Sequence, residues 1–170
     1  AIKILKPHRS FYLSELWSQA CSAYSSIPNS QFSDAIMWLI NTSSLDLEEF
    51  FGSDTPKYAI LSHTWEEAEE VSFQEFVSRS AASKQGWSKI RKTCAKAARH
   101  GFKYAWIDTC CIDKRSSAEL TESINSMFKW YQDAEVCYVY LPDIPVDIPA
   151  VDAMEKLKDC RWFRRGWTLQ

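Results

Sequence analysis

The sequence has no apolar run that approaches the roughly 20 residues of a membrane-spanning helix. Its N-terminus lacks the continuous apolar core and the cleavage site of a secretory signal peptide. The six cysteines show no regular spacing, which argues against a disulfide framework and predicts reduced thiols in a cytoplasmic protein. A formal net charge of −2 argues against a general nucleic-acid binder.

Glycine is scarce, with four residues in 170, whereas tryptophan is plentiful, with eight. Many aromatic side chains imply large buried contacts or a stacking surface. The hydrophobic fraction of 46% and the charged fraction of 25% are ordinary for a globular protein. This length favours one domain with a substantial core, and the sequence shows neither an internal repeat nor a low-complexity stretch.

Three short apolar runs, at 58–61, 104–107 and 136–141, alternate with helical patterns. That alternation predicts an α/β fold, with a mostly parallel sheet and flanking helices. A further strand is expected at 37–40. Residues 1–36 are expected to form an N-terminal extension ahead of a domain at 37–170. Within the extension, one helical face predicts an amphipathic helix over about 10–25 that packs on its own domain or docks on another subunit.

The helix after the second apolar run is predicted to begin at Ser116, because Glu119 follows three residues later in a capping-box pattern. Its buried stripe is predicted from the 3.6-residue period to contain Leu120, Ile124, Met127, Phe128 and Tyr131.

Two more helices are expected between the first two apolar runs. Ser72 and Glu75 form a second capping-box pattern that opens a short helix near 73–78. A longer helix is expected over about 87–100, closed by Gly101. Its non-apolar face carries five cations and no acid, so it is either a phosphate or nucleic-acid surface or, as we favour, a solvated face opposite the acidic 66–75 stretch. The cations are Lys89, Arg91, Lys92, Lys96 and Arg99.

Polar residues follow each of the three predicted buried strands. The carboxyl ends of parallel strands lie at one edge of a sheet, where ligands bind in open α/β folds. We therefore expect one site there, joined by Glu119 from the start of the following helix. The strand-end residues are Ser62, His63, Thr64, Trp65, Asp108, Thr109, Cys110, Cys111, Asp113 and Asp143.

Each of these residues also has a purely structural interpretation. His63 can be a hydrogen-bonded structural histidine, Asp108 can cap the turn after its strand, and Cys110 and its neighbour can be small buried hydrophobes. A metal site and a Cys–His nucleophilic pair are less favoured, because neither the ligand spacing nor a local activating group supports them. Glu122 is expected to point to solvent, whereas Glu119 lies at the flank of the apolar stripe, where its carboxylate can bond the backbone of the capping serine.

Four blocks of the sequence, in this order, resemble the signature blocks of the fungal heterokaryon-incompatibility (HET) domain. The resemblance covers about 37–170. The family's last block normally continues with Glu-Leu after the position of Gln170, so the resemblance implies either a domain truncated at its C-terminus or an unusually short member. It also implies a role in fungal non-self recognition, in which the HET domain triggers programmed cell death. The blocks are Tyr58-Ala-Ile-Leu-Ser-His-Thr-Trp65, Trp106-Ile-Asp-Thr-Cys-Cys-Ile-Asp-Lys114, Ser116-Ser-Ala-Glu-Leu-Thr-Glu-Ser-Ile-Asn-Ser-Met-Phe128 and Arg165-Gly-Trp-Thr-Leu-Gln170.

The order of elements is also similar to that of Toll/interleukin-1 receptor (TIR) domains, which implies a flavodoxin-like three-layer arrangement. Some TIR domains cleave NAD with a glutamate on the helix that corresponds to the one after Ser116, and others only assemble. That glutamate matches Glu119 best, with Glu122 as the second choice. The TIR glycine before this helix is absent here, where Arg115 precedes the serine.

The chemistry that the resemblance implies is glycosidic cleavage at the nicotinamide ribose, with NAD or a related nucleotide as substrate and no cofactor. A carboxylate would stabilise the oxocarbenium-like transition state and bind ribose hydroxyls. Trp65 would stack on a planar ring, and Arg164 or Arg165 would meet phosphates. The alternative is a non-catalytic signalling module that acts by homo-oligomerisation and partner recruitment, with the helix at 10–25 as a contact.

Overall fold

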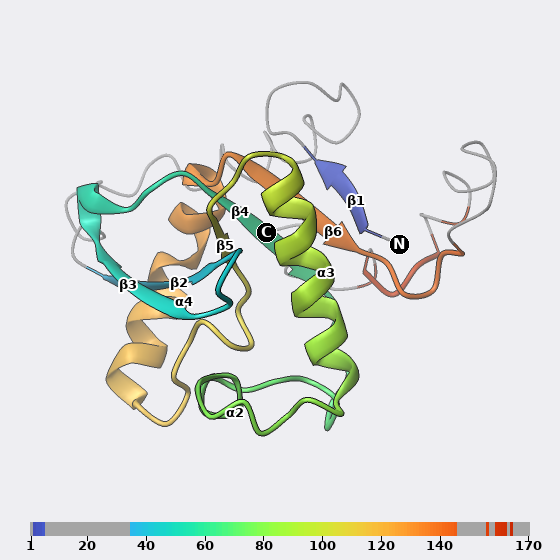
Figure 1. Ribbon diagram of the computed structural model, residues 1–170, viewed down its shortest axis with the longest axis horizontal. Helices are drawn as coiled ribbons and strands as arrows, with labels where there is room; N and C mark the ends of the chain where they lie inside the picture. Colours follow the sequence, from blue (N-terminus) through green and yellow to red (C-terminus); the bar gives the residue numbers. More distant parts are fainter. Residues whose placement is uncertain (1, 6–34, 146–155, 157–158, 163, 165–170) are drawn as a thin grey trace.

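The computed structural model describes residues 2–5, 35–145, 156, 159–162 and 164 (Figure 1). The predicted helix at 10–25 therefore lies outside the described residues, as does Arg165. Within the described part of the chain, no helix is both long and apolar enough to cross a membrane. The elements follow in chain order as β1 (Ile2–Leu5), β2 (Ile36–Asn41), β3 (Leu47–Phe51), the 3-10 turn η2 (Gly52–Asp54), β4 (Tyr58–His63), α2 (Phe73–Val77), α3 (Gln85–Arg99), β5 (Tyr104–Trp106), α4 (Ser117–Asp133) and β6 (Val136–Tyr140).

Six strands form one sheet in the order β1-β6-β4-β5-β2-β3. The three apolar runs of the sequence are its centre, where β4 pairs in parallel with both β5 and β6. The outer pairings are antiparallel: β1 with β6, β2 with β5, and β2 with β3 in a hairpin. The predicted α/β class is confirmed, and the sheet is mixed, with a parallel centre and antiparallel edges. One edge strand, β1, comes from the segment predicted as an N-terminal extension.

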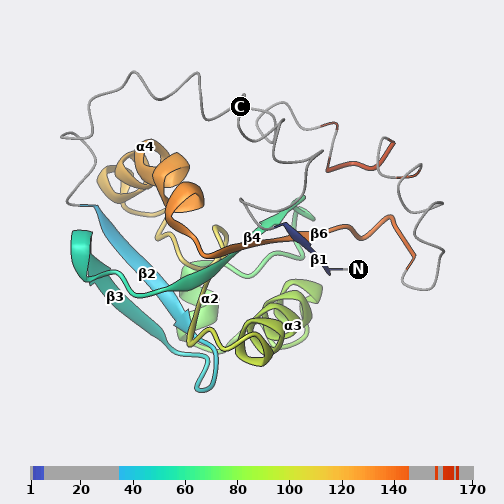
Figure 2. The same ribbon diagram turned by 90° about the horizontal axis from the view of Figure 1, so that it is seen from above.

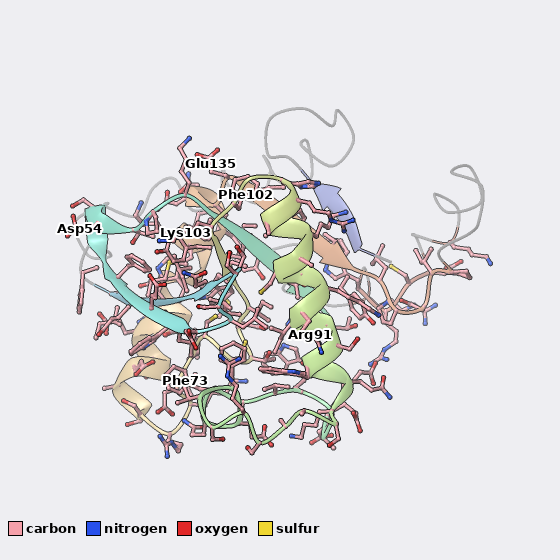
Figure 3. The ribbon with its side chains drawn as sticks, viewed as in Figure 1. Asp54, Phe73, Arg91, Phe102, Lys103 and Glu135 are labelled. Atoms are coloured by element: carbon pink, nitrogen blue, oxygen red, sulfur yellow. The ribbon has the colours of Figure 1, made fainter. Side chains whose placement is uncertain are left out.

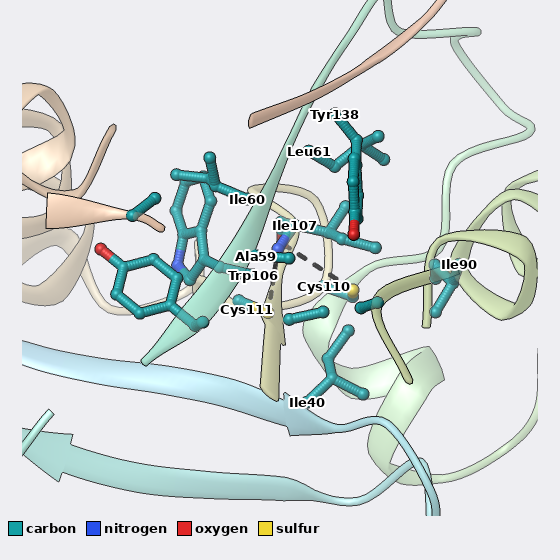
Figure 4. Packing of buried hydrophobic residues seen from close by; sticks show 14 of the residues in the cluster. Ile40, Ala59, Ile60, Leu61, Ile90, Trp106, Ile107, Cys110, Cys111 and Tyr138 are labelled. Carbon is teal, nitrogen blue, oxygen red and sulfur yellow. Dashed lines mark hydrogen bonds between the residues drawn. The ribbon is translucent and has the colours of Figure 1, made fainter. Parts of the chain in front are cut away.

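The helices cover both faces of the sheet. Figure 2 shows α4 on one face and α2 and α3 on the other, which is the predicted three-layer arrangement. Between these layers, the four residues Tyr58 to Leu61 of β4 are at most 2% exposed. Figure 4 shows how Ile60, Trp106 and Ile107 pack in this core. Strands buried on both faces read as continuous apolar runs, which is why the sequence revealed them.

The helix ends follow the capping patterns of the sequence. In α2, the Ser72 side chain accepts from the backbone N–H of Glu75 while the Glu75 carboxylate accepts from the backbone of Ser72, so the predicted capping box is confirmed. At the end of α3, Gly101 has a φ of +83°. The N–H groups of Gly101 and Phe102 bond to the carbonyls of Ala98 and Ala97, which is the Schellman arrangement that needs a left-handed residue.

The predicted buried stripe of α4 is wrong at Ile124, which is 58% exposed. The helix instead buries Ser123, Ser126 and Trp130, a stripe with spacings of three and four residues. The Trp130 ring packs edge-on against Trp106, with centroids 5.5 Å apart. Of the other predicted positions, Leu120, Met127 and Tyr131 are partly buried and pack against the core.

Candidate functional site

The ends of β4 and β5 bring His63 and Asp108 together, as their strand-end positions predict. His63 Nε2 lies 2.7 Å from Asp108 Oδ1, and both side chains are buried, at 2% and 3% exposure. The indole N–H of Trp65 donates to the other carboxylate oxygen at 3.0 Å. Asp108 therefore has a partner on each oxygen, and it holds the side chains of both His63, the last residue of β4, and Trp65.

Lys89 of α3 extends this pair into a chain of four groups, of which three are buried and Glu70 is partly buried. Its Nζ lies 2.8 Å from His63 Nδ1 and 2.7 Å from Glu70 Oε2. An ammonium group only donates hydrogen bonds, so Nδ1 of His63 accepts and the ring proton lies on Nε2, facing Asp108. We call this chain of Asp108, His63, Lys89 and Glu70 the buried polar chain.

The placement of Lys89 corrects the sequence interpretation, which assigned it to an exposed basic face. Lys89 is 5% exposed. A side chain at Gly86 would place its Cβ 2.5 Å from the carbonyl oxygen of Glu69, so only glycine lets the start of α3 pack this closely on the 69–71 backbone. That close approach places Glu70 against Lys89, one turn further along the helix.

The acidic residues of the 66–75 stretch contact the beginning of α3 and not its outer face. Besides Glu70, it supplies Glu75, which pairs with Lys84, and Glu69, which accepts from the backbone N–H of Gln85. The four remaining cations of α3 form no ion pair with a described carboxylate. They are Arg91, Lys92, Lys96 and Arg99. Figure 3 labels Arg91.

The charge state of the site follows from its contacts. Burial favours the neutral form of Asp108, but its contact with His63, the hydrogen bond from Trp65 and the charge of Lys114 outweigh burial, so the pKa of Asp108 lies below its ordinary value of 3.8. Burial raises the pKa of the Cys110 thiol well above its ordinary value. A protonated thiol is a poor nucleophile, so the contacts do not favour a Cys–His pair.

A second cluster surrounds Asp113, and it holds Glu119. The backbone N–H of Asp113 donates to Glu119 Oε1 at 3.1 Å. The Asp113 carboxylate accepts from Gln74 of α2 and from Arg115, which lowers the pKa of Asp113 to about 2, with the Arg115 contact as the main cause. The loop after β5 is thereby tied to α2 and to the first turn of α4.

Only half of the predicted capping box of α4 is present. Ser116 accepts from the backbone N–H of Glu119, but the carboxylate of Glu119 turns to Asp113 and not to the serine backbone. Glu119 is half-buried, and Glu122 is exposed on the outer side of the helix, as the periodicity predicts. Glu119 is therefore the glutamate of this helix that reaches the strand-end loops.

Trp65 connects the two clusters. Its indole N–H reaches Asp108 of the buried polar chain, and the ammonium group of Lys114 lies 4.3 Å from its ring centroid. Lys114 follows Asp113, whose N–H holds Glu119. The side chain of Trp65 is nevertheless 46% exposed. The exposed ring and the half-buried carboxylate therefore contact adjacent residues, Lys114 and Asp113.

The other predicted site residues are distributed along the same edge. Ser62 Oγ accepts from the indole of Trp162, and Asp143 accepts from the backbone of Arg161. The guanidinium of Arg161 pairs with Glu66 beside Trp65, whereas Arg164, predicted as a phosphate contact, is exposed.

Four further strand-end residues are buried and form no bond to the buried polar chain. Among the residues that the structure describes, the hydroxyls of Thr64 and Thr109 have no hydrogen-bond partner. The Sγ of Cys110 donates to the backbone carbonyl of Ile107, and the Sγ of Cys111 accepts from its N–H group (Figure 4). Among the described residues, no three histidine, cysteine or acidic side chains gather as a metal site would require.

Sequence reasoning missed Lys89, Glu70 and Lys114 as members of the site. Lys89 carried a usable signal: it lies one position before Ile90, in line with the buried face of α3, and Gly86 marks a close approach one turn earlier. Lys114 carried a weaker signal, because it ends the block that begins at Trp106.

The lowered pKa values of three carboxyl groups predict how the stability of the protein depends on pH. The pKa of Glu75 falls to about 2, mainly through the bond from Lys84, and those of Asp108 and Asp113 are also lowered. The unfolded chain therefore binds more protons than the folded protein between about pH 5 and pH 2, so stability is lost as the pH falls through this range. We expect the free energy of unfolding in urea to decrease from pH 5 to pH 3. The decrease should be smaller in Glu75→Gln; an equal decrease in this variant would contradict the role of the Lys84 contact.

Comparison with known proteins places this site in a family context. The profile of the family described as heterokaryon incompatibility protein (HET) matches residues 58–148. The chain is 52% identical over 120 residues to the vegetative incompatibility protein HET-E-1 of Podospora anserina, an alignment that covers 68% of this chain and 9% of that protein's length. No solved structure matches the chain significantly. The profile match runs from the start of β4 past the end of β6, so it includes both clusters and Trp65.

Proposed function

Because the chain belongs to the heterokaryon incompatibility (HET) family, we propose that it is an effector domain of fungal non-self recognition that promotes cell death by cleaving NAD or a related nucleotide. The relative HET-E-1 is a vegetative incompatibility protein, and this chain spans about a tenth of its length. The proposal therefore concerns the domain, and whatever surrounds it in a longer protein would set the trigger.

The position of Glu119 carries the proposal. It stands in the first turn of α4, where the strand-end loops meet the helix, and it is half-buried. Its Oε1 accepts one backbone hydrogen bond, from Asp113, and among the described residues Oε2 has no protein partner. One oxygen thus fixes the carboxylate, and the other remains available to a substrate. Glu122 points outward and has no comparable setting.

The reaction that suits such a carboxylate is hydrolysis of a glycosidic bond. The bond between the ribose C1′ and the nicotinamide nitrogen breaks, the bonding electrons leave with neutral nicotinamide, and positive charge develops on the ribose ring. An anionic carboxylate beside that ring stabilises the charge and accepts hydrogen bonds from ribose hydroxyls. Water then adds to C1′ and releases a proton, which gives ADP-ribose.

The proposal predicts that Glu119→Gln loses most nicotinamide release from NAD, by a factor of about 100 or more. The variant keeps the size of the side chain and its hydrogen bond to the Asp113 backbone, so the fold should be intact by circular dichroism. Release would be followed by chromatography over a series of protein concentrations. Glu122→Gln, an exposed glutamate one turn along α4, is the matched control and should retain full activity.

Two results would contradict this proposal. Equal activity in wild type and Glu119→Gln would remove the carboxylate from the reaction. No release by the wild type, even at high protein concentration, would favour the alternative of a non-catalytic module that acts by oligomerising and recruiting partners. Sedimentation of the same samples would then show whether the chain self-associates.

A further inference from the structure

Trp65 is exposed, and it is also held in place. The large hydrophobic side chains that are exposed in the described part of the chain are Phe51, Trp65, Val77 and Ile124. Of these, only Trp65 has a polar atom, and its N–H bonds a carboxylate that is itself 3% exposed. Asp108 is in turn held by His63, and His63 by Lys89. The indole is therefore anchored through three buried groups to helix α3.

This anchoring has a free-energy cost that an ordinary surface tryptophan would not have. Each buried polar or charged group gives up water and must be compensated by its partners. A chain of such groups that ends on an exposed aromatic ring is explained if the ring must keep one orientation. A pre-oriented indole is a platform on which a planar ring stacks without further loss of conformational freedom.

Lys114 adds positive charge at the same place. Its ammonium group lies 4.3 Å from the centroid of the Trp65 ring. The preceding residue, Asp113, holds Glu119 through its backbone N–H. The indole and the carboxylate thus contact two adjacent residues of the loop after β5, Lys114 and Asp113, so one extended ligand could meet both.

We propose that Trp65 and Lys114 form the binding site for the adenine nucleotide portion of the substrate, with the purine stacked on the indole and the phosphates near the ammonium group. This inference rests on the proposed function, because it assigns one end of the dinucleotide whose other end Glu119 would meet.

Charge decides which ring Trp65 receives. The nicotinamide ring of NAD carries a positive charge before cleavage, and the ammonium group of Lys114 over the indole would repel it. Adenine is neutral and its phosphates are anionic, so both parts suit an aromatic ring with a neighbouring cation. A negative charge such as Glu119 suits the positively charged nicotinamide riboside.

The test measures binding of ADP-ribose, adenosine and nicotinamide mononucleotide to the 170-residue chain by isothermal titration calorimetry. ADP-ribose has no nicotinamide bond to cleave, so its binding is independent of turnover. Stacking of one base on an aromatic side chain predicts that Trp65→Ala weakens ADP-ribose binding about tenfold or more. Lys114→Met should weaken ADP-ribose but leave adenosine nearly unchanged. Trp65→Phe keeps a ring but loses the bond to Asp108, so its loss should be intermediate.

The chain offers matched controls for both substitutions. Phe51→Ala removes an equally exposed aromatic ring from the edge strand β3, and Lys103→Met removes an exposed lysine whose Nζ lies 5.0 Å from the ring centroid of Tyr104. Neither change should alter binding. Circular dichroism of each variant shows whether it is folded.

The inference is overturned if folded Trp65→Ala binds ADP-ribose as the wild type does, or if the wild type does not bind it at millimolar concentration. Tighter binding of nicotinamide mononucleotide than of ADP-ribose, lost in Trp65→Ala, would overturn the assignment to adenine. These results are separate from the nicotinamide-release assay. If ADP-ribose binding depends on Trp65 but NAD is not cleaved, the binding site stands and the hydrolase proposal fails. If cleavage depends on Glu119 but binding does not depend on Trp65, the hydrolase proposal stands and the binding site fails.

Discussion

Replacing Lys89 with methionine is expected to lower the free energy of unfolding by about 3 to 5 kcal/mol, the cost of removing one partner of a buried ion pair. Lys89 is 5% exposed, and its ammonium group donates to Glu70 and to His63. Methionine fills similar space but donates nothing. The substitution would leave the buried Nδ1 of His63 without its donor and would remove the ammonium group that pairs with the partly buried Glu70 carboxylate.

Urea unfolding of Lys89→Met beside Lys92→Met gives the sharpest comparison. Lys92 lies on the same helix, is exposed, and forms no ion pair with a described carboxylate. Its replacement should change the free energy by no more than about 0.5 kcal/mol. Similar losses in the two variants would show that Lys89 is not buried against Glu70.

A double-mutant cycle then tests the pairing itself. Glu70→Gln alone should also destabilise the protein, but the combined Lys89→Met and Glu70→Gln variant should lose less than the sum of the two, because neither charge is left alone. Additive losses would contradict the contact between these side chains.

The centre of the fold was predictable because its signals are local. The runs at β4, β5 and β6 are buried on both faces, so they are uniformly apolar, and the rule that parallel strands share a carboxyl edge placed His63 next to Asp108. The cap at Gly101 was also predictable, since a left-handed residue is needed there whatever surrounds it.

The partner of Lys89 could not be predicted in this way, although its position in line with Gly86 and Thr93 hints at burial. Hydrophobic periodicity treats every lysine as a solvent-facing residue, and an acid 19 positions earlier in the sequence gives no local sign of contact. Only the close packing of α3 on the 69–71 backbone brings the two together. The same limit applies to Lys114 and Trp65, whose contact depends on how two loops fold over one another.

In helix α4, the sequence pattern and the structure disagree about which residues are buried. Periodicity assigns Ile124 to the buried stripe, whereas the structure exposes it and buries Trp130, at 8% exposure. The Trp130 ring packs against Trp106, and its backbone carbonyl accepts from the Tyr58 hydroxyl, so this residue fastens the helix that carries Glu119 to the sheet.

Trp130→Ala is expected to lower the free energy of unfolding by about 3 to 5 kcal/mol, because it removes a large buried ring and leaves a cavity over the sheet. Ile124→Ala, on the same helix, should change it by at most about 0.5 kcal/mol, because its side chain is already in water. Urea unfolding measures both. A large loss in Ile124→Ala with little in Trp130→Ala would mean that α4 is rotated about its axis, as the hydrophobic period alone predicts. Glu119 would then turn with the helix, away from the backbone of Asp113, and the carboxylate would lose the contact that orients it for catalysis.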